Sequence, residues 1–389
     1  MMSRKRMIQM VALLATVMLC ACSGGSGSSD TSSPTAKTGV FKDSNVSGLQ
    51  YTTSSGQSGV TDASGHYSYM TGDTVTFSVG GVTLGNTAAS GVVTPVDLVA
   101  GGSSSSPAVV NIVRFLMMLD SNGNPGDGIA ISAQVQTAAE AWADLDFSDP
   151  DFDTNVAALI TECITADSGA HLLPDAATAQ NHLEGSLRCA YSGAFRGTFS
   201  GSDRGTFGVI VDCQTGEVRG AAFSTTYDSL TEGYGTGSID YDQTMAFITG
   251  FVDAGATFQG RLTSPNAMSG TWQDDYGSDH GNFSGNRIGG AVEASYRYTG
   301  LFYNDDTATG GVLAMDVSGD VITGVGYGIE NNEQFTVSGT LSGSTITATT
   351  SNGVQISGTM NGDDTFDGTW NDPAHGEYGT FDGCGCQLN

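Results

Sequence analysis

Apolar and polar residues alternate with a period of two over most of this chain, which is the pattern of β-strands. In Asp73–Val79 every second residue is apolar, and Gly80-Gly81 follows as a hairpin turn. Short alternating stretches separated by Gly, Asp, Asn and Ser also fill residues 190–386. We therefore predict a mainly β protein.

Residues 101–189 break this alternation and show the pattern of helices. Ala108–Leu119 is apolar nearly all round and follows Ser106-Pro107, which is typical of a helix start, so we predict a helix buried between its neighbours. Arg114 inside that helix must find an acidic or carbonyl partner. Further helices are predicted at Ala133–Asp144, Thr154–Ala166 and Asp175–Cys189. The expected fold is therefore mainly β with a helical insert that forms a short bundle.

The C-terminal half contains one β unit twice. Phe258–Gly285 matches Ile356–Gly383 at a constant offset of 98 residues. Further upstream, we align Tyr191–Phe195 with Tyr298–Phe302, and Gly208 with Gly311. The eight strands predicted for the first copy are Ser192–Phe199, Arg204–Val211, Glu217–Ser224, Glu232–Ile239, Thr244–Val252, Thr257–Thr263, Met268–Gln273 and Gly281–Arg287.

Two copies of eight short antiparallel strands predict two tandem eight-stranded β-barrels, with a two-sheet sandwich as the alternative. Trp272 and Trp370 hold the same place in the two copies, and we expect them to fill the barrel interiors. In outline the two copies resemble the small barrels of transferrin-binding-type surface lipoproteins, a likeness of architecture that transfers no binding residue.

The N-terminus has the features of an export signal. Arg4-Lys5-Arg6 precedes Met7–Leu19, an apolar run too short to cross a bilayer of about 30 Å as a helix. Leu19-Cys-Ala-Cys22 then resembles the lipobox of bacterial lipoproteins. The resemblance implies cleavage before Cys22 and acylation of that residue as a membrane anchor. Ser23 after the lipidated residue implies sorting to the outer membrane, on its periplasmic or its surface face; the alternative is an ordinary cleaved signal peptide.

The first β region resembles the prealbumin-like modules called carboxypeptidase-regulatory-like or CNA-B-like. The resemblance is carried by Val46-Ser-Gly-Leu-Gln-Tyr51, by Gly59-Val-Thr-Asp62 and by Gly65-His-Tyr-Ser-Tyr69. It implies a β-sandwich that acts as a spacer without activity of its own. The expected organisation is a signal peptide (1–21), a Ser/Gly-rich tether (22–38), this module (39–100), a helical connector (101–189) and two barrel repeats (190–289 and 290–389).

Charge and composition narrow the range of partners. The 389 residues include 41 acidic and only 13 basic ones, and three of the basic residues lie in the leader. Nucleic acid is an unsuitable partner because phosphate binding requires a basic face. The 56 glycines, at 39% hydrophobic content, fit tightly packed β structure with many turns.

One loop carries oxygen ligands at the spacing of a calcium site. Asp120, Asn122 and Asn124 occupy the first, third and fifth positions of an EF-hand loop, and Asp127 follows. Pro125 stands where the turn glycine belongs and the twelfth position is Ile131, so a standard EF-hand is excluded. A looser calcium loop, helped by acidic residues of 144–153, is one interpretation. The alternative is a turn closed by its own Asn and Asp side chains.

Five cysteines follow Cys22, and an exported chain is expected to pair them. They are Cys163, Cys189, Cys213, Cys384 and Cys386. Cys163 with Cys189, Cys213 with one of the terminal pair, and Cys384 with Cys386 are open alternatives, because connectivity does not follow from sequence.

We find no motif that indicates catalysis. The sequence lacks the nucleophile elbow, the zinc-protease motif, the P-loop and the dinucleotide fingerprint. Asp274-Asp275 and Asp363-Asp364 are carboxylate pairs of the kind glycosidases use, but they fall in predicted turns. We expect a non-catalytic, membrane-anchored lipoprotein that binds a protein or glycan ligand through its barrel loops. The alternatives are a structural envelope protein without a ligand and an unrecognised surface hydrolase.

Overall fold

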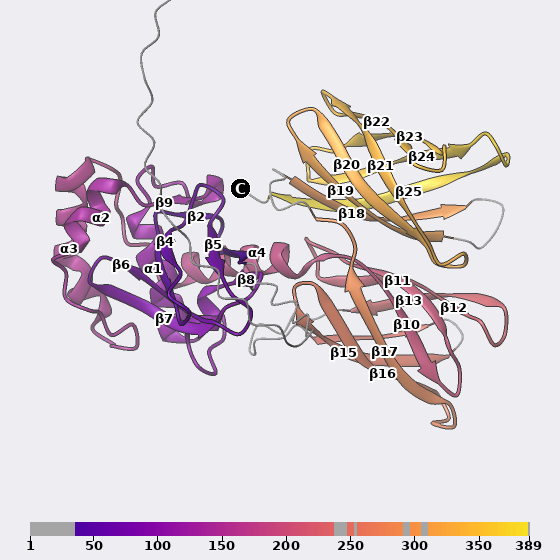
Figure 1. Ribbon diagram of the computed structural model, residues 1–389, viewed down its shortest axis with the longest axis horizontal. Coiled ribbons are helices and arrows are strands. Elements are labelled where there is room, and N and C mark those ends of the chain that lie inside the picture. The colour runs from indigo at the N-terminus through magenta and orange to yellow at the C-terminus, as the bar shows by residue number, and fades with distance from the viewer. Residues whose placement is uncertain (1–35, 237–246, 253–254, 291–295, 305–309, 388–389) are drawn as a thin grey trace, which may run out of the picture. The chain divides into compact units, whose positions relative to one another are not determined.

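The computed structural model describes residues 36–236, 247–252, 255–290, 296–304 and 310–387. Strands predominate among them, as the alternation predicts (Figure 1). Cys22, the signal peptide and most of the tether lie outside the described residues.

Two small sheets form the N-terminal β region. The first has the order β5-β1-β8 and the second the order β4-β3-β6-β7. Their inner faces meet, since the rings of Phe41 in β1 and Phe77 in β6 lie 4.8 Å apart and Tyr67 in β5 makes an edge contact with Phe77. The strands are β1 (Lys37–Phe41), β3 (Gln50–Thr53), β4 (Ser58–Val60), β5 (His66–Tyr69), β6 (Thr74–Val79), β7 (Val82–Ala88) and β8 (Val92–Val93).

The four predicted helices are present. They are α1 (Pro107–Leu119), α2 (Ala133–Ala139), α3 (Phe152–Asp167) and α4 (Ala176–Tyr191), with short 3-10 turns η1 (Pro95–Leu98) and η2 (Pro125–Asp127). Helix α2 ends five residues before the predicted Asp144. Beyond it the Trp142 indole donates to Glu162 and the Asp144 carboxylate accepts from the Thr83 amide, so the side chains of both residues bond to other segments.

The β region and the helices share one hydrophobic core. Strands β2 (Val46–Ser47) and β9 (Ile129–Ala130) pair across the two regions. Arg114 has the partners its burial requires, because its Nη1 donates to Asp153 at 2.6 Å and its Nε to the Pro174 carbonyl at 2.8 Å. Among the described helices none is long and apolar enough to cross a membrane.

The C-terminal half forms two closed eight-stranded barrels, β10–β17 and β18–β25, each with neighbouring strands in chain order (Figure 1). The prediction of closed barrels is confirmed, and the sandwich alternative is wrong. Barrel 1 comprises β10 (Gly193–Gly201), β11 (Gly205–Val211), β12 (Glu217–Ser224), β13 (Ser229–Thr236), β14 (Phe247–Val252), β15 (Ala256–Ser264), β16 (Ala267–Asp274) and β17 (His280–Arg287). Barrel 2 comprises β18 (Tyr296–Asn304), β19 (Gly310–Ser318), β20 (Val321–Gly328), β21 (Glu333–Ser342), β22 (Thr345–Thr350), β23 (Gln355–Met360), β24 (Thr365–Asp372) and β25 (Glu377–Gln387).

The strand ladders correct the upstream alignment of the two repeats. Phe199 lies opposite Phe283 in barrel 1, and Phe302 lies opposite Phe381 in barrel 2. Phe283 and Phe381 are equivalent, so Phe302 corresponds to Phe199 and not to Phe195. The same ladders place Gly205, and not Gly208, at the position of Gly311.

Candidate functional site in the first barrel

The interior of barrel 1 is the main candidate site. Successive residues of a strand face opposite sides, so one residue in two of each strand faces the axis of a closed barrel. In barrel 1 these inward residues include Phe207, Val211, Val218, Leu262 and Met268, which are buried together.

They leave an apolar cavity of about 170 Å³ that is partly open to solvent. Its walls are mostly aromatic and aliphatic side chains from six strands, and its few polar side chains come from near one end of the barrel. The apolar wall residues include Phe199, Phe207, Val218, Phe258, Met268, Trp272 and Phe283. An engineered apolar cavity of about 150 Å³ stays dry and binds benzene, so a space of this size accepts a small apolar molecule.

At the cavity, barrel 1 lacks a large side chain that barrel 2 has. Thr231 pairs with Ala222 in barrel 1, at the position where Phe335 pairs with Gly326 in barrel 2. The Phe335 ring lies 5.8 Å from the Phe302 ring and packs against the core of barrel 2, whereas Thr231 lines the cavity of barrel 1. A Cβ at Gly326 would come within 2.3 Å of the Phe335 ring, so that phenylalanine requires glycine opposite it.

At a second position, too, barrel 1 has a smaller side chain than barrel 2. Met268 and Phe366 occupy equivalent positions in the two barrels. Met268 lies opposite Leu262 and Phe366 lies opposite Met360, and Leu262 and Met360 are themselves equivalent by the offset of 98 residues. Phe366 packs against Phe381 and Tyr298 in the filled core of barrel 2. Equivalent strands therefore enclose a packed core in one barrel and a cavity in the other.

The cavity opens toward the end of barrel 1 that carries the β10–β11, β12–β13 and β16–β17 turns. Asp203 and Ser224 line this end, and the Ser224 hydroxyl donates to the Asp203 carboxylate at 2.9 Å. Two tyrosines stand out from the neighbouring turns: Tyr227 is 67% exposed and Tyr276 is 94% exposed. Such rings present an apolar face and a hydroxyl group to a partner.

Both tryptophans form the same corner in their barrels. The Trp272 indole donates to the Ser200 carbonyl at 3.2 Å, and its ring makes an edge contact with Phe199. The Trp370 indole donates to the Tyr303 carbonyl at 2.9 Å, and its ring makes an edge contact with Phe302. Both indoles are half-buried. Trp272 also forms part of the cavity wall, so it belongs to the candidate site as well as to the packing.

The predicted calcium loop is closed by its own side chains. The amides of Asn122 and Asn124 donate to the Asp127 carboxylate at 3.2 and 3.0 Å. Asp120 is buried and accepts from the Ala130 amide, and burial raises its pKa. Within the described residues, no group of three or more His, Cys, Asp or Glu side chains is placed to hold a metal.

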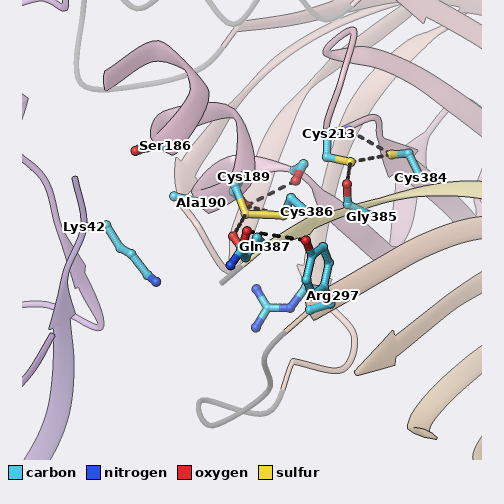
Figure 2. Close-up of a disulfide and its surroundings, with 12 residues drawn as sticks. Lys42, Ser186, Cys189, Ala190, Cys213, Arg297, Cys384, Gly385, Cys386 and Gln387 are labelled. Carbon is cyan, nitrogen blue, oxygen red and sulfur yellow. Dashed lines mark hydrogen bonds between the residues drawn. A yellow bond between two sulfur atoms is a disulfide. The ribbon is translucent and has the colours of Figure 1, made fainter. Parts of the chain in front are cut away.

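The structure pairs Cys189, at the end of α4, with Cys386 in β25 (Figure 2). This bond corrects two of the pairings that the sequence suggested, Cys163 with Cys189 and Cys384 with Cys386. Those pairings rested on nearness along the chain, whereas the observed bond joins residues 197 positions apart. Cys163 is a buried thiol on α3, where burial raises its pKa to about 12.

The paired acidic residues act as turn-forming groups. Asp274 accepts from the Ser278 hydroxyl at 2.7 Å, and Asp363 accepts from the Thr365 hydroxyl at 2.6 Å. These bonds lower the pKa of both carboxyl groups. A glycosidase acid requires a raised pKa, so neither group suits that role.

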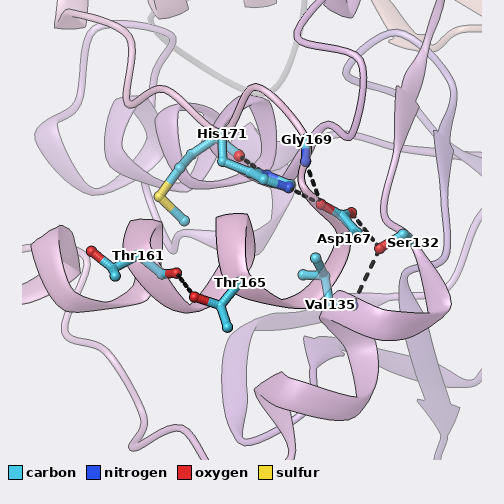
Figure 3. Close-up of polar contacts among 8 residues, drawn as sticks. Ser132, Val135, Thr161, Thr165, Asp167, Gly169 and His171 are labelled. Carbon is cyan, nitrogen blue, oxygen red and sulfur yellow. Dashed lines mark hydrogen bonds and ion pairs between the residues drawn. The ribbon is translucent and has the colours of Figure 1, made fainter.

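The buried His171 and the half-buried Asp167 and Ser132 have the residue types of a catalytic triad but a different order (Figure 3). Asp167 is in the middle: its Oδ1 lies 2.6 Å from His171 Nε2, and its Oδ2 accepts from the Ser132 hydroxyl at 2.5 Å. The other ring nitrogen of His171 contacts the Met118 carbonyl. The histidine does not reach the serine, and Ser132 caps α2 through the Val135 amide, so the group joins three elements.

The comparisons with known proteins place the chain in no family. No protein-family model matches it, and no curated protein matches it. A solved structure described as "Crystal structure of MucB in complex with MucA(peri)" is 9% identical, with 52% of this chain and 93% of that chain covered and a TM-score of 0.13. A TM-score this low supports no conclusion on fold or function.

Proposed function

We propose that this protein is a non-catalytic binding lipoprotein of the bacterial outer membrane, and that barrel 1 takes up a small apolar molecule or the apolar end of a larger one. The observation that supports this function most directly is the apolar cavity of barrel 1, at positions that barrel 2 fills with Phe335 and Phe366. A structural envelope protein would have no need of a hollow in one of two duplicated barrels.

In this proposal the remaining parts hold and present the barrels. Acylated Cys22 anchors the chain, and the tether and the N-terminal module, which we interpret as prealbumin-like, act as a spacer. Tyr227 and Tyr276 supply contacts at the cavity mouth for the part of a protein or glycan ligand that remains outside. Calcium is not required for this binding.

The affinity that the cavity can supply follows from its apolar character. Burying each carbon is worth about 0.8 kcal/mol, so the seven carbons of toluene supply about 5–6 kcal/mol. A Kd of 1 mM corresponds to about 4 kcal/mol. We therefore expect saturable binding of toluene below about 1 mM.

A reciprocal exchange between the barrels tests the proposal. The double variant Ala222→Gly/Thr231→Phe gives barrel 1 the glycine and phenylalanine of barrel 2, and it is expected to abolish toluene binding. The opposite double variant, Gly326→Ala/Phe335→Thr, leaves the barrel 1 cavity intact and is the control that retains binding. Titration by calorimetry and by tryptophan fluorescence measures both.

Two results would contradict this function. Absence of saturable binding by the unaltered mature protein would remove the cavity as a site and favour the structural alternative. Equal binding by the filled variant and the unaltered protein would place the site elsewhere. Circular dichroism and a cooperative unfolding transition establish that the filled variant is folded.

A further inference from the structure

The outward face of β25 bonds to three segments from earlier in the chain. Phe381 belongs to the core of barrel 2, so Asp382, Cys384 and Cys386 point outward from the barrel. Asp382 accepts two hydrogen bonds of 3.1 Å from Arg219 of β12. Cys386 is bonded to Cys189. The position between them, Cys384, meets Cys213.

The contact between Cys213 and Cys384 is close and buried. Their sulfur atoms lie 2.7 Å apart, and the Cys213 amide donates to the Cys384 sulfur at 3.1 Å (Figure 2). The two residues are 9% and 2% exposed. Little displacement separates this arrangement from a bonded pair, whose sulfur atoms lie about 2.05 Å apart.

We propose that Cys213 and Cys384 form a second disulfide, which ties the β11–β12 turn of barrel 1 to the last strand of barrel 2. The neighbouring Cys189–Cys386 bond indicates an oxidising environment, in which two thiols in contact do not remain reduced. With both bonds in place, Cys384 and Cys386 attach β25 to barrel 1 and to α4.

The chemistry is thiol–disulfide exchange. A cysteine thiolate attacks a small disulfide such as oxidised glutathione, one glutathione thiol leaves, and the second cysteine displaces the other from the mixed disulfide. The two protein thiols together lose two protons and two electrons, and the glutathione disulfide is reduced to two thiols. In the folded protein the hydrogen bond to Cys384 and burial raise the pKa of Cys213, so the reactive thiolate is scarce. We therefore expect the bond to form while the chain folds.

Disulfide mapping of the mature protein tests this bond. The protein is exported to a bacterial periplasm, or refolded with oxidised and reduced glutathione, then unfolded and alkylated without reduction. Digestion at acidic residues and mass spectrometry identify the linked peptides. We expect Cys213 and Cys384 to escape alkylation and Cys163 to be modified fully.

The double variant Cys189→Ser/Cys386→Ser simplifies the assignment, because only Cys163, Cys213 and Cys384 remain to pair in the folded part of that protein, and a linked pair without the Cys163 peptide must contain Cys213 and Cys384. Cys163→Ser is the matched control and leaves both bonds unchanged. Complete alkylation of Cys213 and Cys384 in the unaltered protein would overturn the proposal. So would recovery of Cys384 linked to Cys189 or to Cys386.

Discussion

Asp43 shows how burial sets the charge of a single residue. It is fully buried, and within the described part of the chain neither carboxyl oxygen has a hydrogen-bond partner. Burial raises its pKa to about 6, although His182, with Nε2 at 3.5 Å, favours the charged form. A partner in ionic contact therefore compensates only part of the desolvation.

This shift predicts a pH dependence of stability. The folded pKa lies above the unfolded value of about 3.9, so the contribution of Asp43 is most favourable at low pH and declines as the pH rises through about 6. Relative to Asp43→Asn, the free energy of unfolding of the unaltered protein should fall by about 1 kcal/mol between pH 5 and pH 7.5.

Urea unfolding of both proteins at four pH values across this interval measures the difference. The interval stays above the sequence pI of about 4.1, near which the protein is expected to precipitate. Two stability curves that run parallel would show that Asp43 does not titrate with the stated shift.

At the scale of an element, the two tryptophan corners depend on glycines in the next strand. A Cβ on Gly281 would lie 1.8 Å from the Ser200 carbonyl oxygen and 2.6 Å from the Trp272 nitrogen. A Cβ on Gly379 would lie 1.8 Å from the Tyr303 oxygen. Close approach of backbones, rather than an unusual φ, explains glycine at both positions.

We therefore predict that Gly379→Ala destabilises the protein by about 2 kcal/mol or more, because overpacked positions cost about 1–3 kcal/mol. Gly362→Ala is the matched control, since a Cβ there meets nothing within 4 Å. Chemical unfolding followed by fluorescence compares the two variants. Equal loss of stability in both would contradict the steric explanation.

The loop Asp120–Asp127 gives a prediction on metal binding. Calcium would have to displace the Asn122 and Asn124 amides from Asp127, and the loop is already closed without it. We expect calorimetric titration of the mature protein with calcium to give no saturable heat. A saturable heat that disappears in Asp127→Asn would show that the loop is a calcium site after all.

The elements themselves could be predicted well from the sequence, and the alignment of the repeats could not. Glu217–Ser224 was predicted with both ends correct, because period-two alternation and turn residues are local signals. Gly193-Ala-Phe195 and Gly197-Thr-Phe199 are nearly the same in sequence, so local pattern does not decide which of them matches Gly300-Leu-Phe302. The pairing with β17 and β25 decides it.

At the scale of the whole molecule, the candidate site was not predictable for a related reason. The comparison with barrel 2 rests on the smaller side chains Thr231 and Met268, and these residues lie on two different strands. Thr231 is an ordinary strand residue in the sequence. Only the correct register of the two barrels sets it against Phe335 and shows the missing volume.

The long-range disulfide belongs to the same scale. Cys189 and Cys386 are far apart in sequence, and their bond closes most of the C-terminal half into a loop. Sequence spacing favours disulfides between cysteines that are close along the chain, whereas the fold brings the end of α4 to the last strand of barrel 2. Connectivity is a property of the complete fold.

The last prediction concerns where the complete protein resides. If Cys22 carries several acyl chains, they should hold a strongly acidic chain at a membrane that its own charge would repel. We expect Cys22→Ser to move the protein from the membrane fraction to the soluble fraction of the cell, and Cys20→Ser, the matched control, to leave it in the membrane fraction. Fractionation with detection of the protein, together with the mass of its N-terminal peptide, measures both effects. Membrane association that survives Cys22→Ser would show that the anchor is not the lipid on this residue.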